Sequence, residues 1–323
     1  MRCLVTGASG HFGSCLVRHL LLQGAEVQVV VRRESNLWRL QDVLGRVRIV
    51  YADLADIGAA APHLREAPPD VAFHLAWHGV TAESRNTTQQ ITLNVTGALR
   101  LLEVLHSMGC RYWVGVGSQA EYGPYPVALT EDLPVRPVTA YGVSKLAVGL
   151  LTRKMCELAG MKYLWFRLLA TYGPEDDPRH LIPSVILQFL AGQRPALTAG
   201  EQICDYLYVE DAAEALCQAV VAGAEGVFVL GSGEGYTVRS IVEQIRQLID
   251  PARPVGFGDL PYRPDQVMHL LADISSLRAA TGWRPRTSLR EGLCATVQWH
   301  RSRSANDFYA LNQQRAGASA GLR

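Results

Sequence analysis

The stretch RCLVTGASGHFG, residues 2–13, carries the strongest signal for the fold class of this chain. Its first residues form a short apolar run typical of a buried strand, and residues 13–24 have the spacing of an amphipathic helix that Gly24 ends. Between them, Gly7, Gly10 and Gly13 allow a tight turn. A strand, a glycine-rich turn and a helix in this order predict the first unit of a doubly wound α/β fold.

The same turn predicts a binding site for the pyrophosphate of a dinucleotide. Glycines let backbone N–H groups and the N-terminus of the following helix approach phosphate oxygens closely. Three glycines alone also occur in ordinary turns, so their position directly after the first strand is what favours a dinucleotide site. The residues predicted to contact the cofactor here are Gly7, Ser9, Gly10, His11, Phe12 and Gly13.

Short apolar runs alternate with amphipathic stretches as far as about residue 173. Strands are predicted at residues 26–33, 47–54, 70–77, 112–118 and 161–169, and helices at 94–109 and 140–160. Continuous apolar strands between helices indicate a parallel sheet covered on both faces. With right-handed crossovers, this pattern predicts a Rossmann-type doubly wound sheet.

The alternation changes after TYGPEDDP, residues 171–178. We predict a dinucleotide-binding domain over residues 1–173, to which 205–225 return. A smaller α/β substrate-binding lobe is predicted over 174–204 and 226–305, followed by a flexible tail at 306–323. Within this lobe, Thr237 is a predicted N-cap for a helix over 238–249.

Composition excludes several classes of protein. The chain has 31 basic and 30 acidic residues, scattered in both signs, so no basic stripe predicts binding to nucleic acid or to an anionic membrane. The apolar runs are too short to span a bilayer, and the N-terminus lacks the apolar region of a signal peptide. Seven cysteines without a CxxC pair indicate free thiols in a reducing compartment. We expect a cytoplasmic protein.

Residues after the second strand bear on the choice of cofactor. An acidic residue there accepts a hydrogen bond from the ribose of NAD(H), whereas arginines can bind the 2′-phosphate of NADP(H). Arg32 and Arg33 therefore favour NADP(H), although both could face solvent and Glu34 keeps NAD(H) open. Asp53 is a predicted partner of the adenine amino group, the alternative being a solvated loop aspartate. Leu54, Leu75 and Ala76 complete the predicted cofactor contacts.

The stretch YGVSK, residues 141–145, predicts catalytic chemistry when it is combined with the glycine turn. Tyr141 and Lys145 are four residues apart, so they share one face of a helix. A lysine ammonium and a cationic nicotinamide would lower the pKa of the phenol, which could then exchange a proton with a carbonyl or alcohol. Taken alone, such a pair is more often part of a helix surface. Ser118, at the carboxyl end of a predicted strand, should face the same crevice and orient the reacting oxygen.

Six motifs together resemble the extended short-chain dehydrogenase/reductases, which include nucleotide-sugar epimerases, dehydratases and ketoreductases. They are TGASGHFG, HLAW, NVTGALRLLE, GSQAEYG, YGVSK and DYLYVEDAAEAL, in a resemblance that runs from Met1 to about Trp299. The resemblance implies a catalytic set of Ser118, Tyr141 and Lys145, with the last two also contacting the cofactor. It further implies a nucleotide-diphosphate sugar as substrate and a homodimer joined by helices near 94–109 and 141–160.

Positions that differ from the family pattern narrow the expected activity. Family dehydratases have Asp-Glu after the catalytic serine, where this chain has Gln119 and Ala120, so dehydration is not expected. Glu121 is one residue further and, in an extended chain, would point to the other side. Ala170 and Cys204 replace an asparagine and an arginine that usually help to hold the nucleotide or diphosphate.

Three residues are predicted to contact the substrate: His78, Gln119 and Arg263, the last matching an arginine that reaches the diphosphate in the family. His78 or Trp77 is expected to line the crevice beside the nicotinamide. His74 and His78 are four residues apart, but no third ligand accompanies them, and we predict no metal site.

Four stretches look most like the subgroup of NDP-4-keto-6-deoxyhexose reductases and related epimerases. They are RRESNLWRL, HLAWHGV, DDPRHLIPS and PYRPDQVMHLLADIS. We predict an NADPH-dependent 4-ketoreductase acting on a nucleotide-linked sugar. The alternative is a 4-epimerase that holds NAD tightly, and a more distant one is a non-catalytic dinucleotide sensor.

Overall fold

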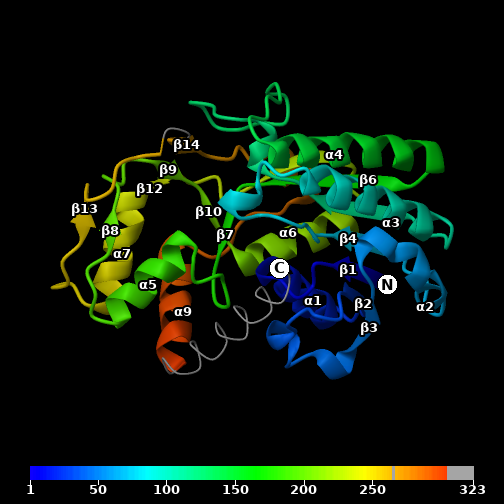
Figure 1. The fold of residues 1–323 in the computed structure, drawn as a ribbon, viewed down its shortest axis with the longest axis horizontal. Helices are drawn as coiled ribbons and strands as arrows, with labels where there is room; N and C mark the ends of the chain where they lie inside the picture. Colours follow the sequence, from blue (N-terminus) through cyan, green and yellow to red (C-terminus); the bar gives the residue numbers. More distant parts are fainter. Residues whose placement is uncertain (264–265, 304–323) are drawn as a thin grey trace. The chain divides into compact units, whose positions relative to one another are not determined.

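A seven-stranded parallel sheet forms the centre of the first part of the chain (Figure 1). The computed structural model describes residues 1–263 and 266–303. The strand order is β11-β6-β5-β4-β1-β2-β3, and each neighbouring pair is parallel. The strands are β1 (Arg2–Thr6), β2 (Glu26–Val31), β3 (Val47–Tyr51), β4 (Val71–His74), β5 (Tyr112–Val116), β6 (Lys162–Leu168) and β11 (Gly226–Leu230). This order confirms the predicted doubly wound sheet, whose direction of winding reverses between β1 and β4.

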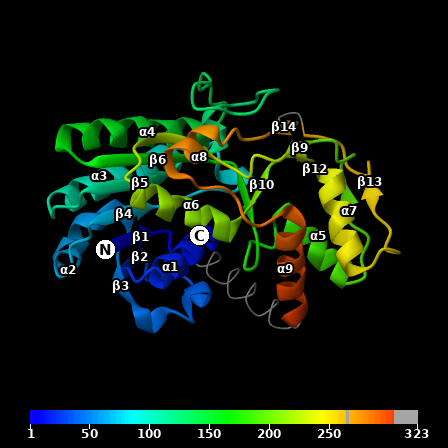
Figure 2. The same cartoon turned by 180° about the vertical axis from the view of Figure 1, so that it is seen from behind.

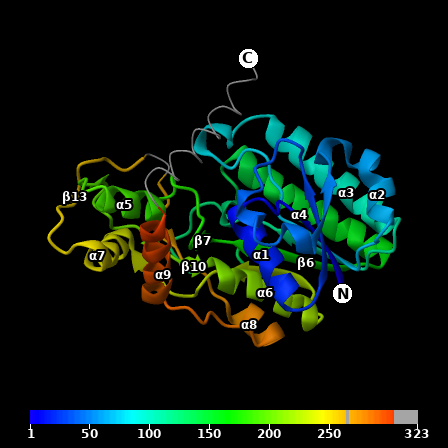
Figure 3. The same ribbon diagram turned by 90° about the horizontal axis from the view of Figure 1, so that it is seen from below.

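Helices cover both faces of the sheet (Figures 1 and 3). On one face lie α1 (His11–Leu22), α6 (Val209–Val221) and α8 (Ser275–Thr281), and on the other α3 (Thr96–His106) and α4 (Ala140–Ala159). Successive strand residues alternate between the two cores: Val5 packs in the first cluster and Leu4 in the second. Both side chains are fully buried, which is why the strands read as continuous apolar runs.

Short elements connect the layers. They are the 3-10 helices η1 (Trp38–Leu40), η2 (Leu44–Arg46), η3 (Leu54–Ala60), η4 (Ala82–Ser84) and η6 (Gln119–Glu121), the π-helix η5 (Gln90–Val95) and α2 (Ala61–Arg65). The remaining short strands are β7 (Ala170–Tyr172), β9 (Ile203–Cys204), β10 (Tyr206–Tyr208), β12 (Tyr236–Thr237) and β14 (His269–Leu270). The π-helix leads directly into α3, so one irregular turn sets where its side chains point.

A second compact unit contains α5 (Leu181–Leu190), α7 (Val238–Ile249) and α9 (Leu289–Ser302), which pack against one another (Figure 2). It also contains the paired strands β8 (Ala196–Leu197) and β13 (Gly256–Phe257). The predicted cap of α7 is confirmed, because the Thr237 hydroxyl accepts a hydrogen bond from the Ser240 N–H at 3.1 Å.

The observed units differ from the predicted domains by two residues at 172–173 and at 203–204, and in two longer segments. The first unit comprises Met1–Thr171, Ile203–Gly235 and Val267–Arg286, and the second Tyr172–Gln202, Tyr236–Gln266 and the described residues from Thr287. The prediction wrongly placed residues 226–235 and 267–286 in the lobe. Instead β11 extends the main sheet beside β6, and Trp283 after α8 is buried in the main core. The predicted tail at 306–323 lies outside the described residues.

Two findings concern the chain as a whole. All seven cysteines are free thiols, as expected from their spacing. Within residues 1–263 and 266–303, none of the helices combines the length and the apolar character needed to cross a membrane.

Candidate active site

The glycine-rich turn between β1 and α1 has the geometry that a close backbone approach requires. Gly7 has φ +72°, and a Cβ there would lie 2.7 Å from the backbone nitrogen of Ala76 at the end of β4. A Cβ on Gly13 would overlap the carbonyl oxygen of Gly7. Gly10 is the N-cap of α1 and offers no side-chain acceptor, so the helix N-terminus remains available to an anion.

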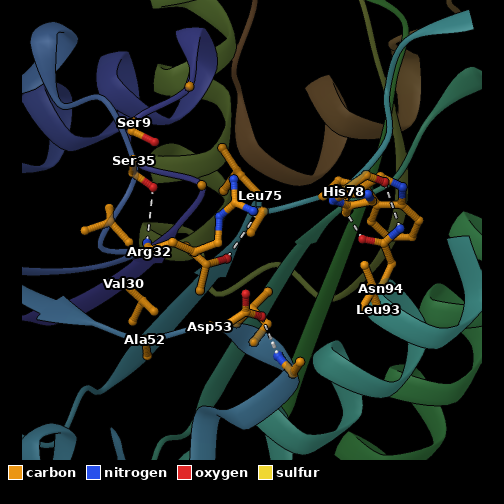
Figure 4. Close-up of a pocket in the computed structure, with 18 of the residues that line it drawn as sticks. Ser9, Val30, Arg32, Ser35, Ala52, Asp53, Leu75, His78, Leu93 and Asn94 are labelled. Atoms are coloured by element: carbon orange, nitrogen blue, oxygen red, sulfur yellow. Dashed lines mark hydrogen bonds between the residues drawn. The ribbon is translucent and has the colours of Figure 1, made fainter. Parts of the chain in front are cut away.

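A cavity of about 520 Å³ opens beside this turn, at the carboxyl ends of the central strands. It is lined by Thr6, Gly7, Ser9, Gly10, Val30, Val31, Arg32, Ser35, Ala52, Asp53, Leu54, Ala55, Leu75, Ala76, Trp77, His78, Gly79, Leu93 and Asn94. Figure 4 shows Arg32 and Ser35 toward one end and His78 and Asn94 toward the other. The cavity lies at the winding reversal between β1 and β4, where ligands of such sheets bind.

Most of the predicted cofactor contacts line this cavity. Eight of them do so: Gly7, Ser9, Gly10, Arg32, Asp53, Leu54, Leu75 and Ala76. The other six, His11, Phe12, Gly13, Arg33, Tyr141 and Lys145, are not in the lining. Phe12 packs against the hydrophobic core instead, and the Arg33 guanidinium lies over the Tyr51 ring, 5.6 Å from its centroid. The arrangement fits a dinucleotide, with the glycine turn beside the cavity and polar groups at both ends.

The polar groups near the end of β2 are already engaged within the protein. The Arg32 Nε atom lies 3.2 Å from Glu34 Oε1, and the Arg32 backbone N–H donates to Ser35 Oγ at 3.2 Å. Asp53 caps η3, because its Oδ1 accepts from the Ala55 N–H at 2.8 Å. Asp53 is therefore a structural cap as well as a lining residue.

Ser118, Tyr141 and Lys145 come together where β5 and α4 meet. Ser118 follows β5, and its hydroxyl accepts from the Ala120 N–H at 3.2 Å and is close enough to the Tyr141 phenol to lower the pKa of that phenol. Lys145 Nζ donates to the carbonyl of Val116 at 2.7 Å and lies 5.9 Å from the centroid of the Tyr141 ring. Ser118 precedes Tyr141 by 23 residues in the sequence, yet both lie at the same corner of the sheet, as the order of the motifs predicted.

Burial and charge both act on the pKa values of this group. Desolvation raises the pKa of Tyr141, while Ser118 and the charge of Arg85 lower it. Desolvation also lowers the pKa of Lys145 from 10.5 to about 7, with Glu121 opposing this shift. The expectation that Lys145 and a bound nicotinamide together lower the pKa of Tyr141 stays a prediction.

Trp77 connects the cavity to this group. Its indole ring centroid is 3.8 Å from Lys145 Nζ and 5.9 Å from the Tyr141 ring in an edge-on arrangement. The indole N–H donates to Gln90 Oε1 at 2.9 Å. Gln90 is fully buried and also bonds Asn94 Nδ2 at 3.2 Å, so a network of amides holds the indole in place.

Glu121 has a structural role that follows from the turn in which it lies. The chain after Ser118 is not extended, because Gln119–Glu121 form a 3-10 turn with a capping box. The fully buried Glu121 carboxylate accepts from the Ser118 N–H at 2.9 Å, from Trp165 Nε1 at 3.0 Å and from Arg167 Nε at 3.0 Å. Glu121 therefore anchors Ser118, and the S-x-x-E spacing was the signal that could have revealed it.

The two histidines have separate environments. His74 is buried, its Nδ1 is 2.9 Å from Thr6 Oγ1, and burial with the nearby Lys145 lowers its pKa from 6.5 to about 3. His78 lines the cavity, and its backbone N–H donates to Asn94 Oδ1 at 2.7 Å. In the part of the chain that the structure describes, no cluster of three His, Cys, Asp or Glu side chains could hold a metal ion.

The other predicted substrate contacts lie in different units. Gln119 is partly exposed next to Ser118, in the first unit. Arg263 is exposed and belongs to the second unit. Their roles in substrate binding stay predictions.

Comparison with known proteins identifies the family. Residues 3–231 match the sequence model of the NAD dependent epimerase/dehydratase family. The dTDP-glucose 4,6-dehydratase 1 of Escherichia coli K12 is 30% identical over 340 residues, covering 94% of this chain and 93% of its own length.

Two solved structures are also similar. The UDP-glucose 4-epimerase of Thermotoga maritima with UDP-glucose is 26% identical, with a TM-score of 0.85 over 94% of this chain and 99% of its own. The UDP-glucose 4-epimerase of Thermus thermophilus with NAD is 29% identical, with a TM-score of 0.82 over 94% and 100%. This chain belongs to the NAD dependent epimerase/dehydratase family. The resemblance to extended short-chain dehydrogenase/reductases is thereby confirmed, and with it the assignment as an enzyme.

Proposed function

We propose that this enzyme reduces the C4 carbonyl of a nucleotide-linked 4-keto-6-deoxyhexose with NADPH. The observation that carries the proposal is the meeting of Tyr141 and Lys145 against Trp77, which also lines the cavity beside the glycine turn. Tyr141 would give its phenolic proton to the C4 oxygen, and the Ser118 hydroxyl would orient that oxygen. The bound nicotinamide would supply the hydride to C4.

The residues around Ser118 support reduction over dehydration. Loss of a hydroxyl needs a carboxylic acid that can protonate the leaving oxygen. The two residues after Ser118 are Gln119 and Ala120, which carry no acid. Glu121 is paired with Arg167 and bonded to Trp165, so its carboxylate is held away from solvent.

The lining of the cavity supports NADP(H). Arg32 and Ser35 line its end beside β2, where they can donate hydrogen bonds to a 2′-phosphate. Glu34 itself is not in the lining. NADPH that exchanges at every turnover is the cofactor that a reductase requires.

A 4-epimerase is the second candidate, and the Arg32–Glu34 ion pair favours it. Glu34 neutralises part of the Arg32 charge at 3.2 Å and places a carboxylate close to the expected ribose position. The similar Thermus thermophilus epimerase was solved with NAD. In this alternative a bound nicotinamide would take the hydride from C4 and return it to the opposite face, while Tyr141 would accept and then return the hydroxyl proton.

The first experiment identifies the nucleotide that the purified protein releases on denaturation. The second follows NADPH absorbance with UDP- and dTDP-linked 4-keto-6-deoxyglucose. Consumption of one NADPH per sugar, without tightly bound NAD, supports the reductase. Stoichiometric bound NAD and interconversion of C4 epimers without added cofactor support the epimerase. A bound nucleotide with neither activity would point to a dinucleotide sensor.

We further propose a homodimer built on α4. Four large apolar side chains on this helix are exposed: Val143 48%, Leu150 57%, Leu151 42% and Leu158 76%. Three of them recur at intervals of seven and eight residues, which places them on one face of the helix. Replacing Leu150 with Glu should convert a dimer to a monomer in light scattering coupled to size-exclusion chromatography. A wild-type protein that is monomeric at micromolar concentration would contradict the proposal.

A further inference from the structure

A loop of residues 77–84 follows β4 and forms part of the cavity wall. Gln90, the first residue of η5, is fully buried against this loop. Its Nε2 donates hydrogen bonds to the Gly79 carbonyl at 2.5 Å and to the Ser84 carbonyl at 3.0 Å. Gly79 has φ +77°, and a Cβ there would lie 2.7 Å from Gln90 Nε2. The loop is therefore folded closely around the Gln90 amide.

The oxygen of the same amide is bonded to residues that line the cavity. Gln90 Oε1 accepts from the Trp77 indole N–H at 2.9 Å and from Asn94 Nδ2 at 3.2 Å. Asn94 pairs with the backbone of His78, accepting from its N–H at 2.7 Å and donating to its carbonyl at 3.0 Å. An amide has two donor hydrogens and one oxygen with two lone pairs, so Gln90 uses its full capacity.

Trp77 lies between this network and the catalytic group. Its ring centroid is 3.8 Å from Lys145 Nζ and 5.9 Å from the Tyr141 ring. The indole N–H is the only hydrogen-bonding group of a tryptophan side chain, so its bond to Gln90 sets the orientation of the ring. Beyond the loop, the Arg85 carbonyl accepts from the Tyr141 backbone N–H at 2.8 Å. The segment is thus fixed both to η5 and to α4.

We propose that Gln90 is a positioning residue for the cofactor, which holds the Trp77 ring and its loop where the nicotinamide half binds. The inference rests on the proposed function in one respect, namely that the nicotinamide lies beside Tyr141. Arg32 and Ser35 lie toward the other end of the cavity (Figure 4). The effect of Gln90 should therefore fall on the nicotinamide half of the cofactor and spare the adenosine half.

The test measures the affinity of the full chain for two ligands by calorimetry: NADP⁺ and 2′-phospho-ADP-ribose, which lacks the nicotinamide. Gln90→Glu keeps the shape and the acceptor oxygen, but it directs a carboxylate oxygen at the Gly79 and Ser84 carbonyls. At about pH 8 the affinity for NADP⁺ should fall about 10- to 100-fold, while that for 2′-phospho-ADP-ribose stays within about 2-fold. NAD⁺ and ADP-ribose take their place if the purified protein releases NAD.

Acid should reverse this loss. A protonated carboxyl can again donate to a carbonyl, and burial raises the pKa of the new group, so affinity for NADP⁺ should recover as pH falls toward about 5.5. Gln247→Glu is the matched control, because Gln247 is exposed on α7 and its replacement changes the net charge equally. It and the wild-type protein are measured over the same pH range, because all three proteins share the ionisable groups of the loop and of α4: His78, Glu83, Arg85, Tyr141 and Lys145.

Equal losses for the two ligands, an unchanged affinity for NADP⁺, or a loss that persists at low pH would each overturn the inference. Should Gln90→Glu not fold, Trp77→Phe decides the question, because it keeps a ring and removes the N–H that Gln90 accepts. Its affinity for NADP⁺ should fall about 2- to 5-fold, with 2′-phospho-ADP-ribose bound as before. An unchanged affinity for NADP⁺ in that variant would contradict the inference.

These measurements separate the inference from the proposed function, because binding needs no turnover. A protein that shows the expected ligand-specific loss but has no reductase activity supports the inference and removes only the function. An active reductase whose Gln90→Glu variant binds NADP⁺ as the wild type does contradicts the inference alone.

Discussion

The ammonium of Lys145 lies 3.8 Å from the centre of the Trp77 indole ring. A cation over an aromatic face in a desolvated site is stabilised by about 2 kcal/mol, less when it is exposed. Here the indole also contacts the Tyr141 ring edge-on and is fixed through Gln90. One wall residue of the cavity therefore contacts two of the three predicted catalytic side chains.

The first prediction concerns Trp77. Trp77→Leu removes the cation–π contact and the partner of Gln90, so affinity for the cofactor held by Lys145 should fall by about 3- to 30-fold, measured by calorimetry. Trp77→Phe keeps an aromatic face and should lose less. Equal losses in both variants would show that the hydrogen bond to Gln90 matters more than the ring.

The second prediction concerns the proton donor. Tyr141→Phe removes the phenolic proton and should lower kcat by at least about 100-fold, while cofactor affinity stays near the wild-type value. Tyr125→Phe is the control, because this half-buried tyrosine donates a solvent-exposed hydrogen bond to the Pro134 carbonyl. Unchanged turnover in Tyr141→Phe would remove this residue from the mechanism.

The third prediction uses two glycines that share a left-handed backbone. Gly7 has φ +72° and Gly24 has φ +74°, but a Cβ at Gly24 meets no atom within 4 Å. Gly24→Ala should cost only about 1 kcal/mol of unfolding free energy from backbone strain. Gly7→Ala adds a clash with the backbone at Ala76, so it should be several-fold more destabilising and abolish cofactor binding. Denaturant unfolding and cofactor titration of both variants check this.

The fourth prediction is the dependence of stability on pH. The pKa of His74 is lowered from 6.5 to about 3 in the folded protein, so the unfolded state binds the proton more readily. The contribution of neutral, buried His74 to the unfolding free energy is fully present above about pH 6.5. It is lost as pH falls toward 3, at up to about 1.4 kcal/mol per pH unit. His74→Asn should flatten this slope in urea unfolding. His300, with its pKa lowered to about 4, contributes a similar slope in the second unit.

A slope that does not change in His74→Asn would show that other groups control acid stability. The Thr6 hydroxyl bonds the imidazole at 2.9 Å, and asparagine can retain that bond. Comparing the wild-type protein with His74→Asn therefore shows the effect of removing the titrating ring while the hydrogen bond to Thr6 is kept.

Sequence patterns predicted those features that depend on local spacing. Continuous apolar runs, without alternating polar residues, correspond to strands that are buried on both faces of the sheet. Thr237 caps α7, as its position before the helix indicated. The glycine turn follows β1 because only glycine tolerates φ +72° against the backbone of a neighbouring strand. Such features are encoded within a few residues of one another.

Which distant side chains meet became evident only from the folded chain. Arg85 reaches the Tyr141 ring from 56 positions away in the sequence, and Trp77 reaches Lys145 from 68 positions away. Residues 226–230 were predicted to belong to the substrate lobe, and only the pairing of β11 with β6 shows that they extend the main sheet. A charge or an aromatic ring acts through its distance and burial, and spacing along the chain specifies neither across separate elements. Local patterns were therefore enough to specify the sheet, the glycine turn and the order of the motifs, whereas folding decided which distant charges and rings lie beside the phenol.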